Sequence, residues 1–127
     1  MAQTTTFNSW TYRDANLAST LTQREIVGYG VEAFDGSIGK IDGATLETDS
    51  GHIVVDTGPW IFGKKVMLPV GVLKSVDHED QKVFVHRTRD EIKNSPEFDD
   101  SLRNDEKYRT ELGSYYDQGG SGYRSWD

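Results

Sequence analysis

The sequence predicts an all-β fold, a small β-barrel of about five to six antiparallel strands with a short C-terminal helix and polar N- and C-terminal extensions. Short apolar runs separated by turn residues follow one another over 26–88, which is typical of strands joined by tight turns. The chain has 13 glycines and 35% hydrophobic residues, as expected for a modest β core with many turns. Its 127 residues suffice for one domain. We therefore expect an arm at 1–25, a barrel domain with its closing helix at 26–98, and a tail at 99–127.

Charge and composition narrow the class of function. The net charge of -7 and the pI near 4.9 give a field that repels phosphate backbones and anionic membranes. The absence of cysteine excludes disulfides, thiolate metal sites and cysteine nucleophiles. The first residues lack the basic and apolar regions of a signal peptide, and no apolar stretch approaches the roughly 18 residues of a membrane helix. We expect a cytoplasmic protein without membrane insertion or direct nucleic-acid binding.

The N-terminal arm is polar with scattered apolar anchors, among them Leu17. Trp10 and Tyr12 are expected to pack onto the barrel, because two aromatic residues in a polar arm are more often docked than free. Residues 22–25 fit the capping-box pattern of a helix start. The residues that follow alternate like a strand and contain two glycines, so we expect no helix to begin there.

The strand pattern is clearest around Asp35 and Gly36, where two apolar runs flank a dipeptide typical of hairpin turns. After the turn, Ile38 and Ile41 have opposite parity, so this strand must bulge or bend if both are buried. Gly39 is placed to allow that bend, and Asp35, Gly36 and Gly39 are the predicted structural residues of the turn. Before the turn, one face that we expect to be packed holds Val27, Tyr29, Val31 and Ala33.

Further strands are predicted at 52–57, 64–68, 70–76 and 82–87. The first of these has three consecutive apolar residues at 53–55, which implies cover on both faces. Pro69 cannot donate to a ladder and so marks a strand end or edge. Thr88, with an acidic residue three positions later, predicts a capping box and a short helix that Pro96 limits.

Beyond Phe98 the chain is charged and helix-compatible as far as 112, and 113–127 is rich in glycine, serine and tyrosine. The Gly-Gly-Ser-Gly run at 119–122 has linker composition, which favours a loosely held tail. The aromatic residues of this segment are alternatively available to dock on the barrel or on a partner, and they are Tyr115, Tyr116, Tyr123 and Trp126.

An ordered series of motifs runs from Gly28 to Phe98. It consists of Gly28-Tyr29-Gly30-Val31, Asp35-Gly36-Ser37-Ile38-Gly39-Lys40, Gly63-Lys64-Lys65-Val66-Met67-Leu68-Pro69-Val70, Val76-Asp77, Val83-Phe84-Val85, and Thr88-Arg89-Asp90-Glu91-Ile92 before Ser95-Pro96-Glu97-Phe98. The series resembles a PRC-barrel domain, the small β-barrel named after the cytoplasmic H subunit of the photosynthetic reaction centre. It covers a little over half the chain. The loop at 56–63 and the tyrosine-rich end look like those of short stand-alone bacterial members.

The resemblance implies an adaptor or assembly role. Relatives of this type include the reaction-centre subunit and the second domain of a ribosome maturation factor. The chain lacks the transmembrane helix of the former and the separate first domain of the latter, so neither specific function is carried over. We expect a non-enzymatic module without cofactor that binds itself, as a homodimer or larger, or another protein. The alternatives are a ribosome- or RNP-associated assembly factor acting through protein contacts, and a small-ligand or metal-binding barrel.

The predicted partner-binding residues lie at one loop tip and just after it. Trp60, Ile61 and Phe62 form the tip, and Lys64 and Lys65 follow. The three apolar side chains either cap an open end of the barrel or form an exposed patch that binds a partner or a second copy. The two lysines beside the aromatics would suit single-stranded nucleic acid, but the net charge of the chain disfavours that interpretation.

No catalytic constellation stands out in the sequence. His52, His78 and His86 match no metal-ligand spacing, and the acidic run at 77–80 is typical of a solvated turn. The glycines at 28 and 30 precede a turn into a second strand and open no helix, so they form no dinucleotide fingerprint. We therefore expect no enzyme activity, no metal and no cofactor.

Overall fold

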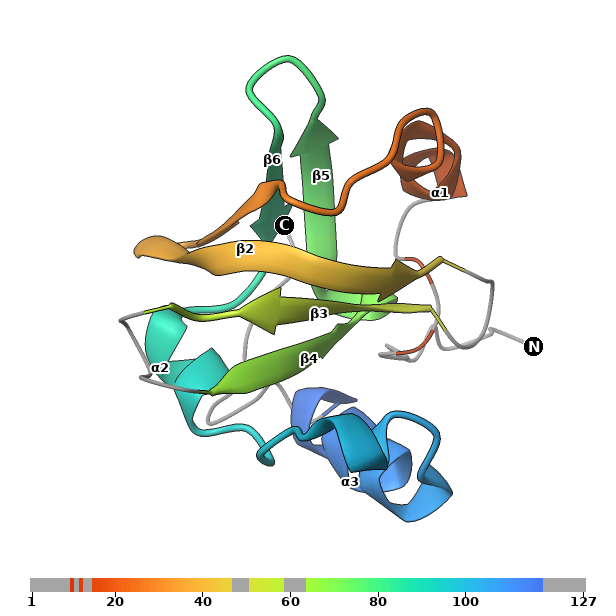
Figure 1. Ribbon diagram of the computed structural model, residues 1–127, viewed down its shortest axis with the longest axis vertical. Helices are drawn as coiled ribbons and strands as arrows, with labels where there is room; N and C mark the ends of the chain where they lie inside the picture. The colour runs from red at the N-terminus through yellow and green to blue at the C-terminus, as the bar shows by residue number, and fades with distance from the viewer. Residues whose placement is uncertain (1–9, 11, 13–14, 47–50, 59–63, 118–127) are drawn as a thin grey trace, which may run out of the picture.

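The computed structural model describes residues 10, 12, 15–46, 51–58 and 64–117 of the chain. These residues form a mostly β structure with short helices (Figure 1). The strands are β1 (Gly30–Ala33), β2 (Gly36–Thr45), β3 (His52–Asp56), β4 (Lys65–Pro69), β5 (Leu73–Asp77) and β6 (Lys82–Val85). The helices are α1 (Ala15–Leu21), α2 (Arg89–Lys93) and α3 (Glu106–Asp117), with 3-10 turns η1 (Val70–Val72) and η2 (Asp100–Leu102).

The six strands form one sheet in the order β4-β3-β2-β1-β6-β5. The predicted β fold of five to six strands with a short helix after them is confirmed. Two details differ from the predicted antiparallel barrel. Strands β1 and β6 pair in parallel, and the sheet is not closed in the described residues. A hairpin holds β2 on one side of β1, and the long crossover to β6 allows parallel pairing on the other side. The edge strands β4 and β5 are consecutive in the chain and are joined through η1.

Strand β2 bends at two bulges, as the parity of its isoleucines predicts. Opposite β1, the register shifts at Ile38, and opposite β3 it shifts again at Asp42. Both Ile38 and Ile41 are buried, which the extra residues make possible. Gly39 has a φ of +141°, and a Cβ there would collide with the Asp56 carbonyl oxygen of β3. Only glycine fits this close approach of two backbones.

The core contains residues of the sheet and of the three α-helices. All three residues at 53–55 of β3 are fully buried, so the predicted cover on both faces is confirmed. On the first strand, Tyr29, Val31 and Ala33 are buried as expected. Val27 is exposed instead, because β1 begins only at Gly30 and the chain before it follows no strand pleat.

Helix α2 begins where the sequence predicts. The Thr88 hydroxyl accepts a hydrogen bond from the Glu91 backbone N–H, and the Thr88 backbone N–H donates to the Glu91 carboxylate. Both bonds of a capping box are therefore present. The Asp35 carboxylate also accepts a hydrogen bond from the Arg89 backbone N–H at 2.8 Å, which attaches the β1–β2 turn to the start of this helix.

The N-terminal arm docks onto the fold and contains a helix that the sequence analysis did not predict. Leu17 and Leu21 of α1 are buried, one turn apart. The Tyr12 hydroxyl donates to the Leu46 carbonyl at 3.0 Å, and Trp10 packs against the core, so the predicted docking of both aromatics is confirmed. The motif at 22–25 starts no helix, also as predicted.

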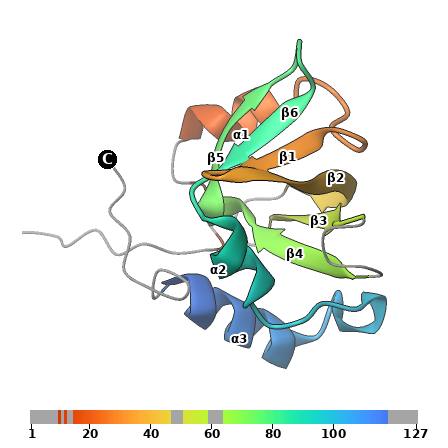
Figure 2. The same cartoon turned by 90° about the vertical axis from the view of Figure 1, so that its left-hand side faces the viewer.

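Helix α3 is held more firmly than the expected tail. Its residues Tyr108, Leu112 and Tyr116 are spaced four apart and are all buried in the common core. The expectation of a loosely held segment is therefore wrong for 113–117, and residues 118–127 lie outside the described part. Figure 2 shows α3 on the β4 side of the sheet and α1 on the β5 side. No helix in the described ranges has the length and apolar character needed to cross a membrane.

Candidate interaction surface

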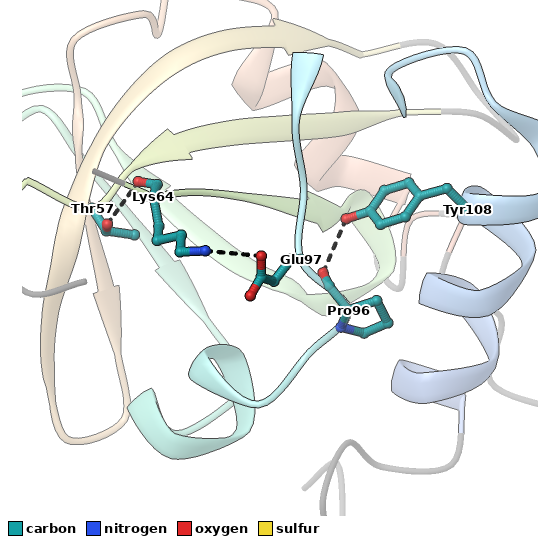
Figure 3. Close-up of polar contacts among 5 residues, drawn as sticks. All are labelled: Thr57, Lys64, Pro96, Glu97 and Tyr108. Atoms are coloured by element: carbon teal, nitrogen blue, oxygen red, sulfur yellow. Dashed lines mark hydrogen bonds and ion pairs between the residues drawn. The ribbon is translucent and has the colours of Figure 1, made fainter. Parts of the chain in front are cut away.

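The outer edge of β4 is partly covered by residues 96–98, which we call the strap (Figure 3). Phe98 forms an antiparallel bridge with Lys65 at the start of β4. The Phe98 side chain is buried, and its ring lies 5.9 Å from the ring of Tyr108 on α3. The Tyr108 hydroxyl donates to the Pro96 carbonyl at 3.2 Å. The strap and α3 thus close this end of the sheet together.

Both predicted binding lysines lie beside this closed edge and are paired with carboxylates. Lys64 Nζ lies 2.8 Å from Glu97 Oε1 of the strap (Figure 3), and Lys65 Nζ lies 2.9 Å from Asp42 Oδ2 in the bulge of β2. The Thr57 hydroxyl donates to the Lys64 carbonyl at 2.8 Å, which joins the two ends of the β3–β4 connection. These contacts fasten β4 to its surroundings.

The tip of that connection, with Trp60, Ile61 and Phe62, lies outside the described residues. Its predicted part in partner binding stays a prediction. The predicted structural residues of the β1–β2 turn are described. Asp35 caps the backbone of α2, and Gly36 and Gly39 both have positive φ values, which suit glycine.

A groove lies on the outer face of the sheet at its other end, over β1, β6 and β5. It encloses about 330 Å³, and we call it the Phe84 groove. Its lining residues are Glu32, Ala33, Phe34, Gly36, Lys74, Phe84 and Val85. Phe34 is 50% exposed and meets the His86 ring edge-to-face at 5.6 Å. The groove thus combines exposed aromatic surface with one carboxylate and one ammonium group.

The strand pleat explains why these side chains face outward. On β6, Val83 and Val85 are buried, so Phe84 between them points to the opposite face. Glu32 of β1 is the register partner of Phe84, and it alternates with the buried Val31 and Ala33. None of these outward residues was among the predicted site residues. The alternation at 82–86 could have indicated that Phe84 faces outward, because this residue lies between two valines of the core.

Strand β5 is the edge of the sheet beside this groove. Helix α1 packs against it, and a histidine holds the contact. His78 Nε2 lies 2.6 Å from the Thr20 carbonyl oxygen, while Nδ1 lies 2.8 Å from the Tyr29 hydroxyl. Because a carbonyl only accepts, Nε2 donates to it, and Nδ1 shares a hydrogen bond with the tyrosine hydroxyl. One side chain therefore connects α1, the β5–β6 turn and the segment before β1.

The three histidines have separate surroundings. His52 is buried on β3 with its ring 6.4 Å from that of Trp10, His78 holds α1, and His86 lies against Phe34. In the part of the chain that the structure describes, no group of three or more histidine, aspartate or glutamate side chains is arranged to hold a metal ion.

Polar groups buried between α2 and α3 secure the C-terminal helix. Arg87 Nη2 donates to the Tyr116 carbonyl at 2.9 Å, and the Tyr115 hydroxyl donates to the Glu91 carbonyl at 2.6 Å. The guanidinium of Arg87 also lies 5.5 Å from the centre of the Tyr116 ring. Burial raises the pKa of the phenols of Tyr116 and Tyr108 well above the usual tyrosine value, because the ionised form would lose its hydration. The donors of this cluster bond to backbone carbonyls and so hold α3 against the rest of the fold.

Comparison with known proteins adds no identity. No family model matches the chain, and no curated protein matches it either.

Proposed function

We propose that this chain is a non-enzymatic protein-interaction module of the PRC-barrel type that associates with a second copy of itself. The ordered motif series from Gly28 to Phe98 supports the family assignment. The observation that carries the interaction is the contrast between a covered β4 edge and the aromatic Phe84 groove at the other end. Exposed aromatic surface is a common feature of protein interfaces.

The described polar residues support a role in binding better than one in catalysis. The buried Arg87 side chain donates to the Tyr116 carbonyl of α3, and the buried Glu91 carboxylate accepts from the Thr88 backbone N–H at the start of its own helix. The phenols with raised pKa values stay neutral at physiological pH and are poor general bases. Such groups stabilise the docking of helices, and this use accounts for their burial.

Size-exclusion chromatography with light scattering, over a wide range of protein concentration at moderate salt, tests the proposal. We expect a dimer or larger species that dissociates on dilution. A monomer at every concentration would overturn the self-association. Trp60→Ala should weaken the association if the loop tip takes part in it.

A further inference from the structure

We infer that the second copy packs face to face on the Phe84 groove, with a two-fold axis along β6 that sets Glu32 of each copy against Lys74 of the other. The inference rests on the proposed self-association and names its surface. It follows from the order of side chains across β1, β6 and β5 and from the charges on the two flanks of the groove.

The register places an acid, an aromatic ring and a base in one line across the sheet. Glu32 of β1 pairs with Phe84 of β6, and Phe84 pairs in turn with Ser75 of β5. Lys74 occupies the bulge next to Ser75 and lines the same groove. The groove is therefore negative on its β1 flank, apolar along its middle and positive on its β5 flank.

Among the described residues, Glu32 and Lys74 form no ion pair with each other within one copy. Their backbones lie two strand spacings apart, which is about 10 Å. In the described ranges neither Glu32 nor Lys74 forms an ion pair with another residue. Both ends of the line thus remain available to a charged partner.

A two-fold axis along β6 matches the groove with itself. Rotation about an axis in the interface plane, parallel to β6 and above Phe84, exchanges the two flanks. The Glu32 of one copy then faces the Lys74 of the other, twice in each dimer. The Phe84 side chains meet at the centre, and both Phe34 side chains lie at the same end of the interface. This isologous contact is self-complementary in charge and in apolar surface.

The groove fits a second copy better than an added strand on β5. Strand addition would need the outer edge of β5, against which α1 packs. It would also leave Glu32 of β1 two strands away from the contact. An unrelated partner would need charges of its own arranged in the same spacing, which the second copy already has.

Two single charge variants test this arrangement by light scattering. Glu32→Lys places four lysines at the two pair positions of a homodimer, and Lys74→Glu places four glutamates there. We expect the dimer affinity of each variant alone to be lower than that of the wild type by about 10-fold or more. An equimolar mixture of the two should recover a dimer of wild-type affinity, because every lysine then faces a glutamate across the interface.

Lys107→Glu and Glu111→Lys on α3 are the matched controls, since both positions are exposed and each change alters the net charge equally. They should dimerise like the wild type. Circular dichroism checks that all four variants are folded. A wild-type dimer that both groove variants leave unchanged would overturn this interface while keeping the self-association. Weakened variants that do not recover on mixing would overturn the two-fold pairing, and a monomeric wild type would overturn both proposals.

Discussion

The two ends of the open sheet differ in how far other segments of the chain cover them. At the β4 end, the strap, α3 and Trp10 pack over the strands, and the lysines are tied to carboxylates. At the β5 end, α1 supports the edge while the outer face keeps an aromatic groove with two opposite charges. The extensions of the chain thus pack at both ends and leave the groove on the outer face accessible. Residues outside the strand core therefore decide which part of the sheet can meet a partner.

The exposed fractions of two phenylalanine side chains illustrate this difference. Phe98 in the strap is 5% exposed and contacts Tyr108, while Phe34 at the groove is 50% exposed. The same side chain thus contributes to folding at one end and is available for binding at the other. Substitution of each one by alanine separates the two roles.

Phe98→Ala should give the largest effect on stability, lowering the free energy of unfolding by about 3 kcal/mol through the cavity left behind. Phe34→Ala should cost less than about 0.5 kcal/mol, because its ring is half in water. Urea unfolding followed by circular dichroism measures both. Equal losses at the two positions would remove the contrast between the ends of the sheet.

Alkaline titration should destabilise the β4 end through Tyr108 and Tyr116. Burial raises the pKa of both phenols in the folded state, while in the unfolded chain they ionise near pH 10. The unfolded state therefore binds fewer protons above that pH. Stability should be unaffected below about pH 10 and then fall by up to about 1.4 kcal/mol per pH unit for each tyrosine. Part of the phenolate absorbance should therefore develop only as unfolding begins.

Tyr29→Phe removes the hydroxyl that bonds to His78 Nδ1 and should cost about 1 kcal/mol. Amide exchange in α1 should become faster, because the same imidazole holds the Thr20 carbonyl. Tyr108→Phe is the matched change at the β4 end, where the hydroxyl bonds to the Pro96 carbonyl. It should leave exchange in α1 unchanged, and faster α1 exchange in this control would argue against a local link through His78.

Lys64→Ala should have the smallest effect, at most about 0.5 kcal/mol. Its ion pair with Glu97 is well hydrated, with side-chain exposures of 45% and 77%, so water and salt screen it. Thermal unfolding at low and high salt checks this, and the small difference from wild type should shrink as salt is added. A loss above 1 kcal/mol would mean that the strap depends on this pair more than on Phe98.

Local signals in the sequence predicted much of the fold. The opposite parity of Ile38 and Ile41 indicated a bulge, and Thr88 with Glu91 indicated the start of α2. Pro69 marked the end of β4. Each depends on residues close in the chain, where geometry restricts the possibilities.

What the sequence did not reveal depends on distant contacts. The parallel pairing of β1 with β6 joins segments about fifty residues apart, and no local pattern encodes its direction. The docking of α3 was missed because composition near Gly113 outweighed the spacing of Tyr108, Leu112 and Tyr116. The Phe84 groove needs three strands to assemble, so its charged flanks have no signature in any one segment.

The contact between Trp10 and Gly113 can form only late in synthesis, because the two residues lie far apart in the chain. The Trp10 indole lies so close to Gly113 that a Cβ there would be 2.6 Å from its Nε1, and the Arg109 guanidinium lies 4.2 Å from its ring centre. On the ribosome, Trp10 emerges about a hundred residues before Gly113, a delay of roughly 5 to 20 seconds at ordinary rates of synthesis. The nascent chain therefore carries an uncovered β4 end until Gly113 has been made, and chaperones would meet it in that interval.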